Sequence, residues 1–283
     1  MQRYKIIHRT YYNFTDPVTL GPHTLRLRPR EDHELRLESF ALLISPEADV
    51  LWHRDVEDNS IAIASFSQPC QQLAIESELI IQQYLENPLD FLVADYAVAY
   101  PFGYKKDDLV LLSPYMAAPG SEINPGLQRW INSVWRPGTP IQTYSLLQAL
   151  TTSIHTSMTY RVREEPGVQT ASETLAQGTG SCRDFALLLM AAARQLGLAA
   201  RFVSGYIHAP LSSDAGSTHA WAEIYLPGAG WKGFDPTTGA IVGTDHIPVA
   251  VARLPEAVPP VAGSFRGAAS SQLQVGVWVS KCD

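Results

Sequence analysis

The stretch Gly180–Gly197, "GSCRDFALLLMAAARQLG", decides the fold, because it predicts a buried helix that begins at a cysteine. Ser181 is a favourable N-cap residue, and Asp184 follows at the spacing of a capping box. Alanine and leucine occupy nearly every side of the helix, which is typical of a central helix rather than a surface one. Gly197 suits the left-handed conformation that stops a helix. We expect the helix to start at Cys182 and to lie at the centre of a domain.

The position of Cys182 indicates a chemical role. The unpaired N–H groups and the dipole of a helix start stabilise a thiolate, which is the nucleophilic form of cysteine. The same N–H groups can hold the oxyanion of a tetrahedral intermediate. The alternative is that Cys182 is a small buried hydrophobic residue, as free cysteine often is. Cys70 and Cys282 stand at no helix start, and we expect both to be structural.

A base for this cysteine is found in "HAWAEIYLPGAGWKGFD", His219–Asp235, which predicts two strands joined by a turn. If the turn is centred on Pro227, His219 lies directly opposite Asp235 in the antiparallel pair. The carboxylate would then bind Nδ1 of His219 and leave Nε2 to pair with the thiol. The alternative is an ordinary cross-strand ion pair worth under about 1 kcal/mol. The three features together predict a catalytic triad of Cys182, His219 and Asp235.

Composition limits the class of protein. The 283 residues are 46% hydrophobic and 17% charged, a globular mixture long enough for two units. The formal net charge is −7 without a basic block, so neither nucleic acid nor a membrane is expected as a partner. The start lacks the apolar core of a signal peptide, and we expect a cytoplasmic protein. The three distant cysteines and eight scattered histidines predict no disulfide and no metal site, and no cofactor is expected.

The whole sequence predicts an α+β chain in four segments. Residues 1–90 alternate polar and apolar side chains between turns, which predicts an N-terminal β-sandwich of seven or so strands. Prolines recur through residues 91–140 and predict a structured linker with short helices. Residues 141–245 predict the catalytic core, in which the central helix packs on an antiparallel sheet. Residues 246–283 predict a C-terminal arm and a final strand, "QLQVGVWVS".

Three blocks of this sequence resemble a known family. "GSCRDFALLL…LG…ARFVSGY", "HAWAEIYLPGAGW" and "FDPTTG" are similar to the blocks of bacterial transglutaminase-like proteins, which are relatives of the papain-fold cysteine enzymes. The segments "YYNF" and "RLRPR" resemble the β-rich domain that often precedes this core, and "HIPVAVARLPEAVPPVAGSFRG" resembles the segment that follows it. The resemblance implies a transglutaminase-like core with Cys182 as nucleophile, His219 as base and Asp235 as the orienting acid.

Several other residues are candidates whose structural alternatives stay open. Arg183 is either a cleft wall or a salt-bridge partner. Tyr206 and Trp221 are candidates for the substrate cleft or for core packing, and Tyr160 is a candidate second oxyanion donor. Two further histidines show no partner pattern, and we expect them to be structural or solvated; these are His208 and His246.

The predicted reaction is thiol-dependent acyl transfer at an amide bond of a peptide or protein, such as a glutamine carboxamide. We favour hydrolysis by a cysteine protease or amidase, because water needs no binding site of its own. One alternative is a transglutaminase, which transfers the acyl group to an amine. A second is a catalytically silent module that binds peptides or proteins. The sequence indicates neither the substrate, nor the oligomeric state, nor a need for calcium.

Overall fold

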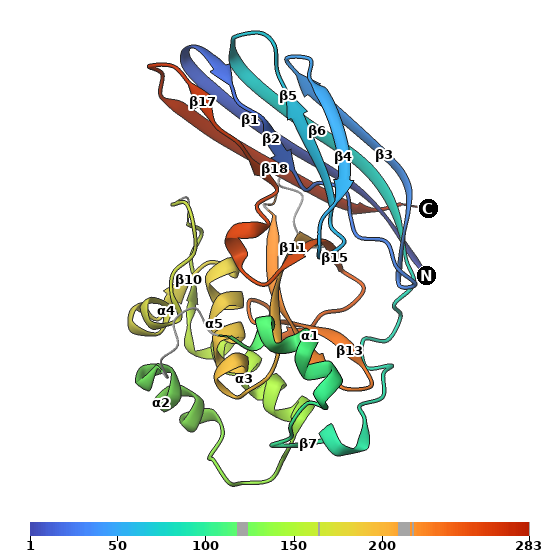
Figure 1. Ribbon diagram of the computed structural model, residues 1–283, viewed down its shortest axis with the longest axis vertical. Coiled ribbons are helices and arrows are strands. Elements are labelled where there is room, and N and C mark those ends of the chain that lie inside the picture. The colour runs from blue at the N-terminus through green and yellow to red at the C-terminus, as the bar shows by residue number, and fades with distance from the viewer. Residues whose placement is uncertain (118–123, 164, 209–215, 217, 283) are drawn as a thin grey trace.

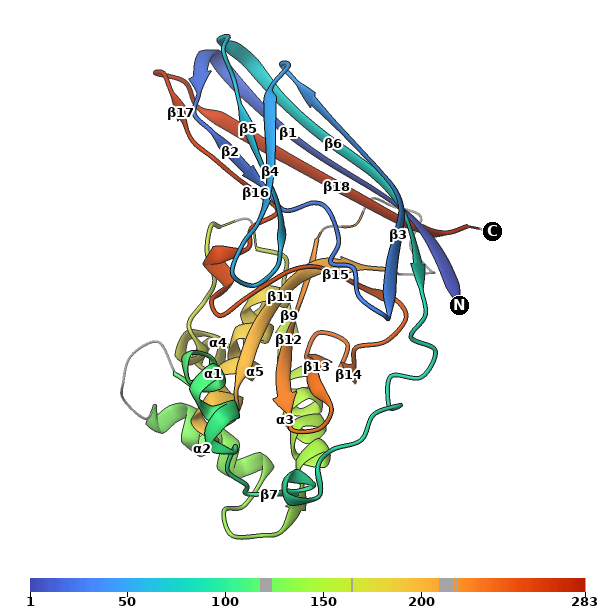
Figure 2. The ribbon, with the colours of Figure 1, turned by 45° about the vertical axis from the view of Figure 1, so that its right-hand side comes forward.

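The computed structural model describes residues 1–117, 124–163, 165–208, 216 and 218–282. The described residues form a mixed structure of helices and β-sheets. Two sheets built largely from the N-terminal sequence lie at one end, and a third sheet with the helices lies at the other (Figures 1 and 2). Within the described residues, no helix combines the length and the hydropathy needed to cross a bilayer.

The first sheet is built around the two longest strands of the N-terminal region. Its strands are β1 (Gln2–Leu20), β3 (Leu35–Ser45), β6 (Cys70–Gln83), β17 (Phe265–Arg266) and β18 (Ser271–Lys281). Strand β1 pairs antiparallel with β6 on one side and with β18 on the other. Figure 2 shows β18, in red, running alongside β1, in dark blue. The final strand predicted from the sequence therefore belongs to the N-terminal sheet.

The second sheet faces the first across an apolar cluster. Its strands are β2 (His23–Leu25), β4 (Asp49–Arg54), β5 (Ser60–Ser65) and β16 (Val261–Ala262). Alternating side chains of β5, such as Ala62 and Ala64, are buried together with Leu73 and Ile75 of β6. The period of two seen in the sequence thus turns one face of each sheet inward.

The third sheet carries the core of the other half. Its antiparallel strands are, in spatial order, β14 (Ala240–Ile241), β13 (Gly230–Asp235), β12 (His219–Leu226), β11 (Ala200–Ile207) and β15 (His246–Ala252). Helix α5 (Cys182–Gln195) packs against β11 and β12. Four short strands form two further pairs. In one, β9 (Thr159–Tyr160) pairs with β10 (Thr179–Gly180), and in the other β7 (Ala99–Tyr100) pairs with β8 (Ile141–Gln142).

Four helices surround α5. They are α1 (Lys106–Met116), α2 (Pro125–Val134), α3 (Thr143–Ser157) and α4 (Ala171–Gln177). The apolar stripe of α3 buries Leu147, Leu150 and Ile154 in the cluster that also holds the inner face of α5. Two 3₁₀ turns complete the described elements, at Asp95–Ala97 and Pro255–Ala257.

The C-terminal segment is divided among all three sheets, which differs from the predicted arm. Strand β15 is an edge strand of the third sheet, whereas β16 extends the second sheet and β17 and β18 extend the first. The sequence "HIPVAVA" of β15 is buried along nearly its whole length, because it packs between β11 and the N-terminal sheets.

The hairpin of β12 and β13 has a different register from the prediction. Its turn is centred on Gly228 rather than on Pro227, so Glu223 faces Gly233. Proline followed by a glycine with φ of 86° is the pattern of a type II turn, and Ala229 N–H donates to Leu226 O at 3.0 Å. The resulting shift is two residues along the partner strand, which keeps every side chain on its predicted face.

Candidate active site

A cleft of about 410 Å³ opens at the N-terminal end of α5. Cys182, the first residue of the helix, lies at the cleft together with His219, the first residue of β12. Much of the wall is apolar and comes from separate parts of the chain, including Val168, Phe202 and the segment 258–260. The cleft can therefore receive an uncharged group of a substrate beside the sulfur.

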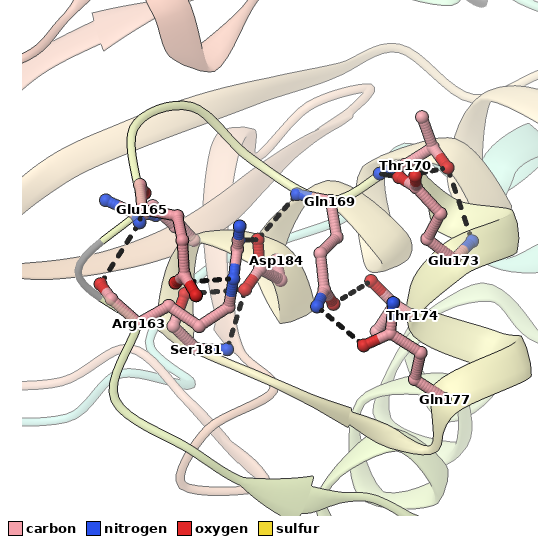
Figure 3. A network of polar contacts seen from close by, with 10 residues as sticks. Arg163, Glu165, Gln169, Thr170, Glu173, Thr174, Gln177, Ser181 and Asp184 are labelled. Carbon is pink, nitrogen blue, oxygen red and sulfur yellow. Dashed lines mark hydrogen bonds and ion pairs between the residues drawn. The ribbon is translucent and has the colours of Figure 1, made fainter.

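The helix start that presents Cys182 is held by Asp184, which is fully buried (Figure 3). The backbone N–H and the hydroxyl of Ser181 donate to Asp184 Oδ2 at 2.8 and 2.7 Å. Gln169 N–H and Arg163 Nη1 donate to Oδ1 at 2.7 and 2.8 Å. Burial alone would raise the pKa of Asp184, but these hydrogen bonds outweigh it and lower the pKa. Asp184 therefore caps the helix as an ion and ties it to the preceding loop.

His219 and Asp235 meet despite the shifted register. Asp235 lies one position beyond Phe234, the residue opposite Ala222, so it is a diagonal neighbour of His219. Its Oδ2 is 2.8 Å from His219 Nε2. Cys182 is the other side chain of the cleft that acts on His219, and Nδ1 is the nitrogen left to face it because Nε2 is occupied. The two ring nitrogens thus have the reverse of their predicted partners.

The electrostatics of the pair favour an imidazolium beside a carboxylate. Burial would lower the pKa of His219, but hydrogen bonds with Asp235 and Cys182 raise it to about 10. Burial would raise the pKa of Asp235, whereas hydrogen bonds from His219 and His246 lower it well below its usual range. At neutral pH the ring next to the sulfur is therefore positively charged.

Asp235 has more hydrogen-bond donors than the sequence indicated. Thr238 Oγ1 donates to Oδ2 at 2.9 Å, and Thr237 N–H donates to Oδ1 at 2.8 Å. His246 Nε2, from the start of β15, lies 3.1 Å from Oδ2. His246 is 7% exposed, so of the two expected settings, structural or solvated, it has the buried one, with a partner that the sequence pattern did not show. The sequence around His246 gave one local signal of this role, which is that the residue begins a strand whose side chains are buried.

Two of the four candidate cleft residues line the cleft and two do not. Arg183 and Tyr160 both border it. Arg183 donates to the main-chain oxygens of Arg163 and Glu165, which fixes the loop in front of α5. Burial and the charge of Cys182 raise the pKa of Tyr160, so its hydroxyl stays a donor.

Tyr206 and Trp221 belong to the interior instead. Tyr206 is 1% exposed, packs among the residues of the N-terminal sheet and bonds His8 Nδ1 through its hydroxyl at 3.1 Å. Trp221 is fully buried behind the site, with its ring 6.0 Å from that of His219. The two side chains pack in different clusters, Tyr206 with the N-terminal sheet and Trp221 with Val203 and Val251. His208, for which the sequence shows no partner pattern, binds Asp245 at 3.1 Å.

The ligand atoms of His219, Asp235 and His246 lie within 4.8 Å of one another, the one such grouping among the described residues. Asp235 Oδ2 already accepts hydrogen bonds from both Nε2 atoms, which are the atoms that would coordinate an ion. The donors therefore satisfy one another, and the cluster fits a hydrogen-bonded arrangement better than a metal centre.

Comparisons with known proteins bear on the family and the fold of the chain. The uncharacterized protein Rv2569c of Mycobacterium tuberculosis is 29% identical over 294 residues, which cover 97% of this chain and 91% of that protein. The uncharacterized protein ML0607 of Mycobacterium leprae is 23% identical over 304 residues, covering 99% of each chain. The crystal structure of "a Putative Cysteine Protease from Cytophaga hutchinsonii" superposes with a TM-score of 0.74 at 18% identity, covering 100% of this chain and 91% of that one. The last likeness shows the fold.

Family models match two parts of the chain. Residues 4–82 match the bacterial transglutaminase-like N-terminal region, and residues 136–236 match the transglutaminase-like superfamily. The second match includes Cys182, His219 and Asp235. The chain therefore combines a bacterial transglutaminase-like N-terminal region with a core of the transglutaminase-like superfamily.

Proposed function

We propose that this protein is a cysteine hydrolase that cleaves amide bonds of peptides or proteins through Cys182, His219 and Asp235. One observation carries the proposal: His219 binds Asp235 through Nε2 at 2.8 Å and lines the same cleft as Cys182, which is among the groups that stabilise its charged form. A histidine that serves only a surface ion pair would have no thiol on its other nitrogen. The cleft gives the sulfur access to a substrate carbonyl.

The reaction proceeds in two balanced steps. The thiolate of Cys182 attacks the amide carbon, and the C–N bond breaks as the His219 imidazolium gives its proton to the departing amine. The neutral His219 then takes a proton from water, whose oxygen attacks the thioester carbon. The C–S bond breaks, the acid leaves, and the ion pair of thiolate and imidazolium is restored. Asp235 holds the ring in the orientation that both transfers need.

The oxyanion formed in each step needs donors. The main-chain N–H of Cys182 has no acceptor within its own helix, because it lies in the first turn. Tyr160 is the second donor that we propose, since its hydroxyl borders the cleft and its raised pKa keeps the proton in place.

The remaining parts of the proposal concern setting. We propose that the two N-terminal sheets are a β-sandwich domain over residues 1–90, that residues 91–140 link it to the catalytic core of 141–245, and that α5 is the central helix of that core. Residues 246–283 join the two parts. The predicted cytoplasmic location stays a prediction, as do the absence of nucleic acid and membrane partners.

The first experiment follows alkylation of Cys182 by iodoacetamide as a function of pH, read by peptide mass. We expect wild-type Cys182 to react near its maximal rate below about pH 7, whereas a free thiol is half ionised near pH 8.5. His219→Ala should slow that reaction at least tenfold. Cys70 in the same sample is the control, because burial raises the pKa of its thiol. A Cys182 that behaves like Cys70 in both proteins contradicts the proposal and favours a silent binding module.

A second experiment separates hydrolysis from transfer. Wild-type protein and Cys182→Ser are incubated with a denatured protein substrate and a fluorescent primary amine. Hydrolysis produces new peptide ends, or carboxylates in place of carboxamides, without fluorescent label. Label on the substrate that depends on Cys182 would instead identify a transglutaminase.

A further inference from the structure

His246 contacts Asp235 from outside the stretch matched by the core family model, which ends at residue 236. It begins β15, three strands away from Asp235 in the order of the sheet, yet its Nε2 reaches Asp235 Oδ2 at 3.1 Å. The side chain is 7% exposed. A buried imidazole that contacts the carboxylate of the site can influence it strongly, because water does not screen the contact.

The hydrogen bonds of His246 fix its tautomer. Gly243 N–H lies 3.3 Å from His246 Nδ1, and a backbone N–H can only donate, so Nδ1 is the acceptor. The proton therefore sits on Nε2 and points to Asp235. Both of its nitrogens are used in this arrangement. The ring offers Asp235 a donor from a side chain outside the turn that follows it.

We propose that His246 is a positioning residue that holds the Asp235 carboxylate against His219. The proposal rests on the function proposed above. Without His246, the donors left on Asp235 besides His219 are Thr237 N–H and Thr238 Oγ1, both from the turn that follows it. These two would draw the carboxylate toward its own turn. The ring of His246 supplies the opposing contact.

His246 is itself held firmly. Its ring meets the Trp221 ring edge-on at 5.3 Å and lies 6.0 Å from the ring of His219. Gln83 of β6 donates to its main-chain oxygen at 3.0 Å. The first sheet thereby fixes the strand end from which His246 reaches the site, so the N-terminal region contributes to the geometry of Asp235.

Two replacements separate hydrogen bonding from packing. His246→Phe keeps a ring against Trp221 but removes the donor. His246→Gln removes the ring but places an amide N–H near the position of Nε2. We expect kcat/KM for amide hydrolysis to fall at least tenfold in His246→Phe, mainly through kcat, and to stay within about threefold of wild type in His246→Gln. The buried His8→Phe, which touches neither Cys182, His219 nor Asp235, is the matched control and should leave kcat unchanged.

The pH profile gives a readout that packing alone would not move. The titratable groups facing this cluster are Cys182 of α5, His219 of β12, Asp235 of β13, Tyr160 of β9 and His246 itself. A displaced Asp235 stabilises the His219 imidazolium less, so the basic limb of kcat/KM in His246→Phe should move to lower pH. A movement to higher pH would mean that His246 competes with His219 and would overturn the proposal.

The other outcomes are equally decisive. Full activity in His246→Phe, or an equal loss in the Phe and Gln variants, overturns the donor role. If His246→Phe does not fold, ¹⁵N NMR of wild type at pH 7.5 decides: a proton on Nε2 of His246 supports the proposal, and a proton on Nδ1 overturns it. Alkylation of wild-type Cys182 tests the proposed function separately, because an unreactive thiol would contradict the proposed triad and not the role of His246.

Discussion

At Asp235, one carboxylate oxygen accepts hydrogen bonds from two imidazoles and a threonine hydroxyl. Buried carboxylates with so many donors stay ionised at low pH, since each donor stabilises the charge. In turn, this carboxylate helps to stabilise the charged form of His219, whose pKa rises to about 10. We therefore expect Asp235, through its effect on the His219 pKa, to set most of the pH range of the proposed activity.

Asp235→Asn should move the basic limb of the pH profile to lower pH. His219 must be protonated to release the amine, so activity is lost as the pH rises through the His219 pKa. Without the carboxylate, that pKa should fall from about 10 toward the ordinary value of about 6.5. We expect kcat/KM at pH 8 to fall at least tenfold, measured with a peptide amide over pH 5–10.

Asp245→Asn is the matched control for this change. Asp245 pairs with His208 and accepts from Tyr4, outside the cleft. Its replacement should leave the basic limb in place. A basic limb that does not move in Asp235→Asn would show that another group carries the proton.

Where the signal was local, the sequence placed the start of a helix correctly. The start of α5 at Cys182 follows from Ser181 and Asp184, which lie within one helical turn. The pairing of His219 with Asp235 needed the hairpin, and its faces survived a register error because the error was two residues. His246 could not be placed, since its approach to Asp235 depends on how the turn after β13 returns the chain to the sheet.

Among the elements, α5 begins at an N-terminal cap whose acidic residue, Asp184, also binds groups outside the helix. Asp184 satisfies Ser181 and Gln169 as well as the Arg163 guanidinium, all in a buried setting. The second capping box, at Thr170 and Glu173 of α4, is exposed and makes only its local bonds. The capping box of α5 should therefore contribute more to stability than the capping box of α4.

Asp184→Asn should lower the free energy of unfolding by about 3 kcal/mol, because it leaves Arg163 without its buried counter-ion. The loss should be largest near neutral pH. Since the pKa of Asp184 is lowered in the folded protein, its contribution is present above the unfolded pKa of about 3.9 and disappears as the pH falls. Urea unfolding at pH 7 and at about pH 2 measures both effects. Glu173→Gln is the matched control and should cost clearly less.

Strand β11 needs a glycine beside the site. A Cβ at Gly205 would lie 2.3 Å from Ile247 O and 2.7 Å from the Trp221 ring, and Gly205 is directly opposite His219. Gly205→Ala should therefore push β15 and Trp221 away, lower the free energy of unfolding by about 1–3 kcal/mol and reduce kcat. Gly103→Ala, where nothing lies within 4 Å, should change neither quantity. Wild-type values for Gly205→Ala would mean that the strands separate freely.

At the scale of the whole molecule, the two N-terminal sheets and the core are joined by buried polar contacts. Asn59 is fully buried at the start of β5, and its amide donates to Val251 O and accepts from Val251 N–H, both at 2.8 Å. Val251 belongs to β15, the edge strand of the core sheet. One side chain thus takes the place of a neighbouring strand and covers part of that edge.

Asn59→Ala should lower the free energy of unfolding by about 3 kcal/mol, because it leaves two main-chain groups of Val251 buried without partners. Denaturant unfolding followed by tryptophan fluorescence measures this change. The exposed Asn13→Ala, which loses a bond to Gln72 on the surface, should cost little. A mild effect at Asn59 would indicate that water enters the junction.

Long-range joins of this kind were beyond the sequence. The mixed class, the β-rich N-terminal region and the helix that presents Cys182 all follow from periodicity and local motifs. The sorting of the C-terminal residues into three sheets does not, since short strands such as β16 and β17 acquire their structure from partners more than two hundred residues earlier.

The pairing of β18 with β1 has a consequence for the order of events during synthesis. Ribosomes deliver the chain from its first residue, so β1 emerges early, while its partner over Tyr4–Phe14 is made after the catalytic core. One side of β1 stays open throughout translation. The segment that builds part of the cleft wall, 258–260, also arrives late. Nascent chains should therefore hold an unfinished cleft, and thiol reactivity should appear only after the residues up to Lys281 have been joined.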